Sequence, residues 1–326
     1  MLNLEEAIIK TICWFDIFDY PLTLYELWSY LYLPLDKRDS ELQKVDLSFL
    51  KRQLENNPNL KKSISCQEGF YFLRGREEIV KIRKRRFNIA ENKFKKSKRI
   101  IKILRLFPFI RMIAVCNTLA YRGAREGSDI DIFIITAKKR IWLARFFSLI
   151  FLSILNLRPK ENDLKDKICL SFFISEDHLD LREVTKKEYD DIYLVYWISQ
   201  LIPFYNHKVY HLFYQKNFWI KDYLPFIQEK LTGERFYADL SYFAKTIKKS
   251  LEFLINFFGG NRIEKFLSSL QMKKLPSKIK EKSNQGVDVV VKEGILKFHL
   301  NDRRDTFYRL WKNKLEYVQK TMGENY

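Results

Sequence analysis

Two aspartates, Asp129 and Asp131, open a segment that is otherwise a run of isoleucine and phenylalanine. The segment, residues 129–136, reads DIDIFIIT and is apolar on both faces after its acidic start, as expected for a strand inside a covered sheet. Because residues two apart in a strand point to the same side, their Cα atoms ~6.5–7 Å apart, the two carboxylates project together. Such a pair is unfavourable unless a cation lies between the charges, so it predicts a magnesium site. The alternative is a solvated strand end.

Alternating strands and helices surround this segment. Residues 111–116 (RMIAVC) predict a preceding strand, residues 139–157 a helix, and residues 168–175 (ICLSFFIS) a further strand. Strand, helix and strand in alternation indicate an α/β layer. The apolar stretch 141–157 is shorter than the ~20 residues of a membrane-spanning helix and contains Arg145, so we expect a buried helix and no stable membrane insertion.

The N-terminal part, residues 1–75, has the order of elements found in a winged helix. Helical periodicity covers residues 3–17, and Thr23 with Glu26 forms a capping box that predicts a second helix through Leu31. A third helix is expected at 47–55. It is followed by two short strands, 63–66 and 70–73, that flank a turn at Gly69.

Residues 76–107 predict one long basic helix that ends at Pro108. Between Arg74 and Arg111 there are fifteen Lys and Arg residues against three Glu, which is most of the net charge of +19. Such a helix is suited to the phosphates of DNA or RNA, with Arg83, Arg85 and Arg86 as candidate contacts. The alternative is a solvated helix that connects two domains.

The C-terminal region, residues 183–326, is expected to be mainly helical. A lysine-rich linker is expected at 273–286 and a short hairpin at 287–300. The helices are predicted at 185–203, 210–230, 234–258, 261–271 and 303–320.

The four cysteines are far apart and form no CxxC pair, which argues against a zinc site. The sequence begins MLNLEEAIIK, with acidic residues where a secretion signal would be basic, so we expect a cytoplasmic protein.

The segment 117–131, NTLAYRGAREGSDID, resembles the motif of the DNA polymerase β-like nucleotidyltransferase superfamily, whose common bacterial form reads much like GSLARGxAxxxSDIDL. Leu119-Ala120, Gly123 and residues 128–131 match position by position, and Asn117 lies twelve residues before Asp129, as in the family. The match is close over about 30 residues. It implies an α+β or α/β chain in which a nucleotidyltransferase core with a small mixed sheet, 109–182, lies between the winged-helix-like domain and the helical C-terminal region, with 76–108 as the connecting helix.

The resemblance also implies a nucleotide-binding loop. Asn117 stands at the family's glycine and Thr118 at its serine. Asparagine tolerates a positive φ, and threonine keeps a hydroxyl for a phosphate oxygen. Ser128 and Arg122 are further candidates for nucleotide contact, although Arg122 is equally consistent with an ordinary surface charge.

Active members of the family place a third carboxylate on a following strand, and residues 168–175 contain none. Asp166, just before this strand, is our candidate for the third catalytic carboxylate and for the base that accepts the proton of the acceptor hydroxyl. Alternatively, Asp166 is a loop charge and Ser171 faces the aspartate pair.

These expectations define a magnesium-dependent enzyme that uses two Mg²⁺ ions to transfer a nucleoside monophosphate from an NTP to an acceptor. One rival is an inactive nucleotide- and nucleic-acid-binding regulator. A second rival is a scaffold whose basic helix meets anionic lipid.

Overall fold

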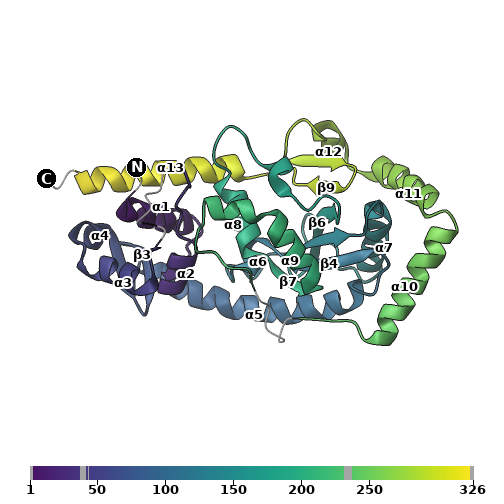
Figure 1. Ribbon diagram of the computed structural model, residues 1–326, viewed down its shortest axis with the longest axis horizontal. Coiled ribbons are helices and arrows are strands. Elements are labelled where there is room, and N and C mark those ends of the chain that lie inside the picture. Colours follow the sequence, from purple (N-terminus) through teal and green to yellow (C-terminus); the bar gives the residue numbers. More distant parts are fainter. Residues whose placement is uncertain (1–2, 37–41, 43, 231–236, 324–326) are drawn as a thin grey trace.

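The computed structural model describes residues 3–36, 42, 44–230 and 237–323. It is a mixed α+β structure built around a six-stranded sheet with helices on both faces, and a small three-stranded sheet lies in the N-terminal part (Figure 1). The first helix and the last helix lie side by side, far apart in sequence.

The N-terminal part contains the expected helices and the expected hairpin. The Thr23 side chain accepts a hydrogen bond from the backbone N–H of Glu26, and Glu26 accepts one from the backbone N–H of Thr23 at 2.9 Å, so the capping box is confirmed. Glu68 and Gly69 both have positive φ and join the two hairpin strands in a two-residue turn. The elements are α1 (Leu4–Asp16), β1 (Leu22–Thr23), α2 (Leu24–Ser29), α3 (Leu47–Asn56), α4 (Pro58–Ser63), β2 (Ile64–Gln67) and β3 (Phe70–Leu73), with sheet order β1-β3-β2.

The long basic helix is α5 (Glu78–Leu104), whose 27 residues span roughly 40 Å. It runs along one side of the molecule from the N-terminal part to the central sheet (Figure 1). One side of α5 is buried, including Ala90, Phe94 and Ile101, so the helix packs along its length and is not a solvated connector.

The central sheet has the order β7-β4-β5-β6-β9-β8. As the alternation predicts, β5 and β6 are parallel neighbours joined by the crossover helix α7, and all other neighbours are antiparallel. The strands and their crossover are β4 (Ile110–Val115), β5 (Ile130–Thr136), α7 (Ile141–Ile154), β6 (Ile168–Ser175), β7 (Ile202–Tyr205), β8 (Val289–Lys292) and β9 (Ile295–Phe298).

Both faces of β5 are buried, as its apolar pattern predicts. Ile132 and Ile134 belong to the core formed with α5 and α7, whereas Phe133 and Ile135 belong to the core formed with α1, α8 (Ile192–Gln200) and α9 (His207–Lys216). The second core is continuous with that of the N-terminal part. The two carboxylates therefore stand at the end of a strand held rigidly from both sides.

Helix α7 is packed against the sheet and contains the buried Arg145, which donates to Gln271 at 2.7 Å. Within the described residues, every helix is too short or too polar to cross a lipid bilayer.

The C-terminal region is less helical than expected. Residues 202–205 form the edge strand β7, and the predicted hairpin joins the central sheet as β8 and β9. The expected linker contains a short helix, and the first residues of the helix expected at 234–258 lie outside the described residues. The remaining elements are α6 (Asn117–Ala120), η2 (Leu181–Val184), η3 (Phe218–Asp222), α10 (Tyr242–Phe257), α11 (Gly260–Lys274), α12 (Ser277–Lys282) and α13 (Arg304–Gly323).

Candidate metal centre

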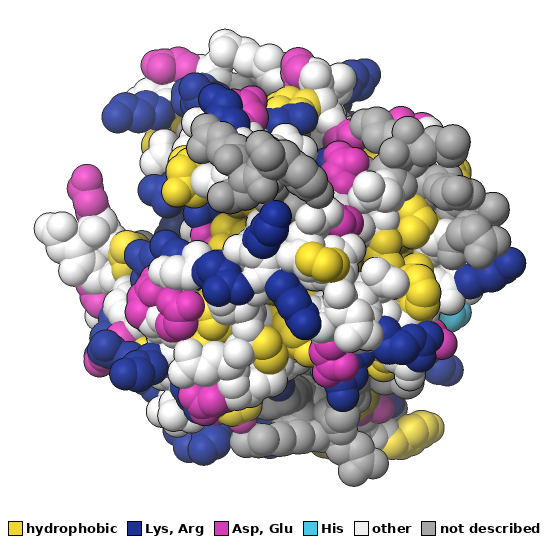
Figure 2. Space-filling view, turned by 90° about the vertical axis from the view of Figure 1, so that its left-hand side faces the viewer, with side chains coloured by type: hydrophobic (Ala, Val, Ile, Leu, Met, Phe, Trp, Pro, Cys, Tyr) yellow, Lys and Arg dark blue, Asp and Glu magenta, His cyan; other side chains and the backbone are white. Residues whose placement is uncertain are grey.

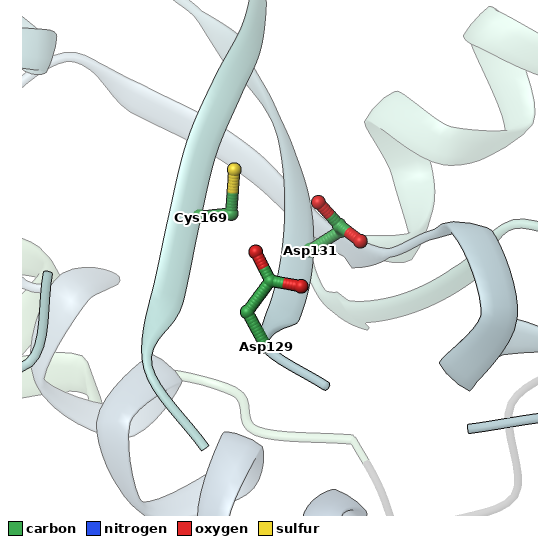
Figure 3. A group of neighbouring side chains, drawn as sticks. All are labelled: Asp129, Asp131 and Cys169. Carbon is green, nitrogen blue, oxygen red and sulfur yellow. The ribbon is translucent and has the colours of Figure 1, made fainter. Parts of the chain in front are cut away.

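Three side chains converge where β5 begins. Asp129 immediately precedes β5, Asp131 lies within it, and Cys169 of β6 is the register partner of Asp131. One carboxylate oxygen from each aspartate and the Cys169 sulfur lie within 4.8 Å of one another (Figure 3). Across the described ranges this is the single cluster of at least three acidic, histidine or cysteine side chains with such spacing. The predicted carboxylate pair is therefore brought together, with a thiol as its third member.

The site strongly disfavours negative charge. Burial and, next, the nearby Asp129 raise the pKa of Asp131 to about 6, although hydrogen bonds with Asn117 and Cys169 act in the opposite direction. Burial also raises the pKa of Asp129. A cation between the two carboxylates would relieve both effects, since it stabilises their ionised forms.

Cys169 was missed at the level of sequence. Burial and the neighbouring Asp131 raise the pKa of its thiol, so the thiol is protonated at neutral pH and can hydrogen-bond the carboxylate. Ser171, the alternative neighbour of the pair, instead bonds His299 Nε2 through its Oγ at 2.8 Å. Strict alternation, which groups Phe173 with Cys169 and Ser171, fails because the register shifts after Asp131 and puts Phe173 in the same core as Ile168 and Leu170. The register itself identifies Cys169 as the residue opposite Asp131.

The segment between β4 and β5 begins with a residue of positive φ, the conformation that asparagine was expected to tolerate there. Asn117 adopts φ 54°, and its side-chain Oδ1 accepts a 2.8 Å hydrogen bond from Trp197 Nε1. The backbone N–H of Gly123 donates to the Thr118 carbonyl at 2.7 Å. A Cβ at Gly123 would lie 2.2 Å from the Tyr121 ring, so a larger residue at this position of the motif would have to displace that ring.

A cavity of about 410 Å³ lies next to residues that adjoin the carboxylate pair. Its wall includes Ser128, which precedes Asp129 in sequence, Asn117, which is hydrogen-bonded to Asp131, and also Thr118. Aromatic side chains from α1, α8 and the C-terminal segment form much of the remainder. The cavity also contains three cationic side chains, Arg86, Arg125 and Arg303.

The other predicted nucleotide contacts differ in their placement. Thr118 is exposed at the cavity, whereas Ser128 Oγ donates to the Arg125 carbonyl within its own loop at 2.9 Å. Arg122 lies outside the cavity wall. Its guanidinium packs over Phe87, 5.4 Å from the ring centroid, and approaches Glu91 at 3.5 Å, so it braces α5.

Asp166 does not join the aspartate pair. Burial alone would raise the pKa of Asp166, but hydrogen bonds from Lys93 and Lys96 hold it below its usual value. Lys93 Nζ donates to Asp166 at 2.8 Å and to the Ser128 carbonyl at 2.7 Å. Two lysines of α5 therefore neutralise Asp166, the expected third carboxylate. Lys93 also links Asp166 to the loop before Asp129, and we call this arrangement the clamp of Lys93 and Asp166.

Two of the three arginines assigned to nucleic-acid contact point into the protein. Arg83 donates to Glu26 at 2.8 Å and stacks on Tyr20, and Arg86 donates to the Phe18 carbonyl at 2.6 Å, whereas Arg85 is exposed. Among the described residues on the end of the molecule seen in Figure 2, basic, acidic and apolar side chains are interspersed. The contacts expected of Arg83 and Arg86 are therefore corrected: these residues hold α5 against the N-terminal part.

Comparisons of this chain with known protein families, with curated proteins and with solved structures find no match.

Proposed function

We propose that this protein binds a nucleoside triphosphate at Asp129 and Asp131 and transfers its nucleoside monophosphate to an acceptor hydroxyl. The observation that carries the proposal is the convergence of two half-buried carboxylates near a cavity whose wall includes Arg125, Arg303 and many aromatic rings. Aromatic faces suit a nucleobase, and guanidinium groups suit phosphate oxygens.

The donor set fits one hard cation better than two. Asp129 and Asp131 would hold magnesium, which, when bound, supplies a Lewis acid for the α-phosphate and the attacking oxygen. A thiol is a poor magnesium ligand and a better one for softer ions such as Zn²⁺. Because Cys169 replaces a third carboxylate, the site would bind a second Mg²⁺ ion more weakly than a site with three carboxylates would.

The reaction itself requires three events that the residues can assist. The acceptor oxygen forms a bond to the α-phosphorus, the bond from that phosphorus to the bridging oxygen breaks, and pyrophosphate leaves. The acceptor proton passes to a carboxylate or to water.

A second candidate is a nucleotide-binding regulator without transfer activity. It is favoured by one observation: Asp129 and Asp131 are the two carboxylates of the cluster, and its third member is Cys169. A winged-helix-like N-terminal part would then carry the output through nucleic acid, with the exposed Arg85 as a phosphate contact.

The two candidates are separated by incubating the protein with each α-labelled NTP and Mg²⁺ or Mn²⁺, beside Asp131→Asn, Cys169→Asp and Cys169→Ser. Label transfer by the wild type that Asp131→Asn abolishes supports the enzyme. NTP binding without transfer in the wild type, with transfer gained in Cys169→Asp and not in Cys169→Ser, supports the regulator. Metal-dependent binding that survives Asp131→Asn, or no binding of any NTP, overturns both.

A further inference from the structure

Helix α10 buries charged side chains and exposes apolar ones, which is the reverse of an ordinary surface helix. Its inward side carries charge: Lys248 Nζ donates to the Arg105 carbonyl at 2.8 Å and to the Ile110 carbonyl at 2.6 Å. One turn later, Glu252 accepts from the backbone N–H of Phe109 at 2.6 Å and binds Arg111 at 2.8 Å. These buried polar bonds attach the helix to the end of the central sheet.

The outward side of α10 is apolar instead. Phe243, Ile247, Leu251, Leu254 and Phe258 follow one another at helical spacing and are all exposed, Phe243 and Phe258 at 73% each. Tyr242, Phe253 and Phe257 widen this stripe, and the rings of Phe253 and Phe257 stack 6.2 Å apart. We call these eight residues the α10 face. An ordinary amphipathic helix would turn such a stripe toward the core.

The α10 face cannot be buried by a simple rotation of the helix. Rotation would break the bonds of Lys248 and Glu252 and leave the half-buried Arg111 and two carbonyl groups without these partners. The exposed stripe is thus fixed by the same contacts that hold α10 in place. Exposed apolar surface of this extent marks an interaction site.

Basic side chains surround the α10 face. Lys245 and Lys249 of α10 and Arg262 and Lys265 of α11 are exposed, and residues 242–282 contain ten Lys and Arg against three Glu. In the described part of the chain, Lys249 and Lys265 form no ion pair, so their charge is available to an external anion.

We propose that the α10 face binds the surface of an anionic lipid bilayer. Aromatic and aliphatic side chains would enter the headgroup boundary, and the surrounding lysines would meet the lipid phosphates. A second copy of the chain is a poorer occupant, because a two-fold contact would set one basic rim against another. Helix α10 lies at the end of the molecule opposite the N-terminal part (Figure 1).

The location leaves the metal centre free. Lys248 and Glu252 bind at Arg105–Arg111, where β4 begins and β5 ends, whereas Asp129 and Asp131 lie at the start of β5. The two sites are therefore at opposite ends of a strand of seven residues, roughly 20 Å apart. A docked molecule would keep its cavity away from the lipid, and the inference does not depend on the proposed function.

The test is co-sedimentation of the full chain with vesicles of phosphatidylcholine alone or with about 30% phosphatidylglycerol. We expect binding to the anionic vesicles that weakens with salt. Phe253→Ser/Phe257→Ser should lower the bound fraction at least about fivefold, because both rings are exposed and their loss leaves the fold intact. Phe218→Ser/Tyr317→Ser, which changes two exposed aromatics elsewhere, is the control and should bind as the wild type does.

A second pair of variants tests the charge. Lys249→Glu/Lys265→Glu should reduce binding, whereas Lys81→Glu/Arg85→Glu on α5 should not. The proposal is overturned if the wild type ignores anionic vesicles, or if the control pairs lose as much binding as the variants of the α10 face. It is equally overturned if the wild type self-associates without lipid and Phe253→Ser/Phe257→Ser is monomeric, which would identify a second copy as the occupant.

Discussion

Trp197 Nε1 donates a 2.8 Å hydrogen bond to Oδ1 of Asn117, and Asn117 in turn is hydrogen-bonded to the side chain of Asp131. One amide thus connects helix α8 to the carboxylate pair. It does so from a backbone position with φ 54°, where most residues are strained. Asparagine serves here as both the turn residue and the link, which glycine could not do.

Replacement of Asn117 should separate these two contributions. Asn117→Gly loses both hydrogen bonds but tolerates the backbone angle, so we expect a loss of about 1–3 kcal/mol in the free energy of unfolding. Asn117→Ala adds the strain of a positive φ, about 1 kcal/mol more. Urea denaturation measures both, with the exposed Thr118→Ala as control. Equal stability of the alanine and glycine variants would contradict the strain.

Removal of the Asp131 charge should stabilise the metal-free protein. In the folded state Asp131 keeps its proton up to about pH 6, above the ordinary value of 3.8, so the unfolded chain binds fewer protons between these values. The free energy of unfolding therefore falls as pH rises through this window and is level above it. Asp131→Asn should be more stable by about 1–3 kcal/mol at pH 7, a gain that vanishes near pH 4.

Bound magnesium should make the wild type more stable than Asp131→Asn, the reverse of the order expected without metal. Millimolar Mg²⁺ should raise the melting temperature of the wild type and leave that of Asp131→Asn unchanged, because a ligand stabilises only the protein that binds it. Thermal melts at pH 7 with magnesium or with a chelator provide the comparison. An equal magnesium response of the two proteins would count against Asp131 as a ligand.

The clamp of Lys93 and Asp166 should matter for stability more than for proton transfer. The Lys93 side chain is 3% exposed and binds Asp166 and the Ser128 carbonyl, whereas that of Lys96 is 51% exposed. Lys93→Met should cost about 2–4 kcal/mol and weaken magnesium binding by loosening the loop before Asp129, and Lys96→Met should change stability by less than about 0.5 kcal/mol. Chemical denaturation and calorimetric titration measure the two effects. Asp166→Ala that lowers turnover with stability and nucleotide affinity intact would restore Asp166 as a base.

Arginines on the two sides of α5 should differ in their effects. Arg83→Ala removes the ion pair to Glu26 and the stacking on Tyr20, so we expect a loss of about 1–3 kcal/mol in stability. Arg85→Ala should leave stability unchanged and, if α5 contacts duplex DNA, reduce the log–log salt slope of binding by about 0.9. Denaturation and fluorescence anisotropy at several salt concentrations test the pair. Equal destabilisation by both substitutions would be inconsistent with the observed side-chain contacts.

The elements with strong local signals could be predicted from the sequence. The apolar run of β5, the unbroken periodicity of α5 and the Gly69 turn each specify their structure within a few residues. Strand β7 was missed because the helix predicted at 185–203 extends through its first two residues. Pro203 is accommodated in the strand since β7 lies at the edge of the sheet, where one side of the backbone needs no partner.

Of the three side chains in the candidate site, the two aspartates could be predicted from the sequence and Cys169 could not. The spacing of Asp129 and Asp131 is a local property, whereas the position of Cys169 depends on the parallel register of β5 and β6, which contains a shift after Asp131. Asp166 was chosen for its position just before the following strand. Its partner Lys93 lies 73 residues earlier, and no local pattern records that contact.

The cavity beside the metal centre is assembled from both ends of the described chain. Phe18, just after α1, and Phe307 of α13 meet in its wall with ring centroids 4.9 Å apart, and Trp311 Nε1 donates to the Lys10 carbonyl at 2.9 Å. This part of the cavity wall therefore forms only after α13 has been synthesised. A nascent chain that has not yet reached α13 carries both aspartates but lacks the stretch of wall formed by Arg303 and Phe307.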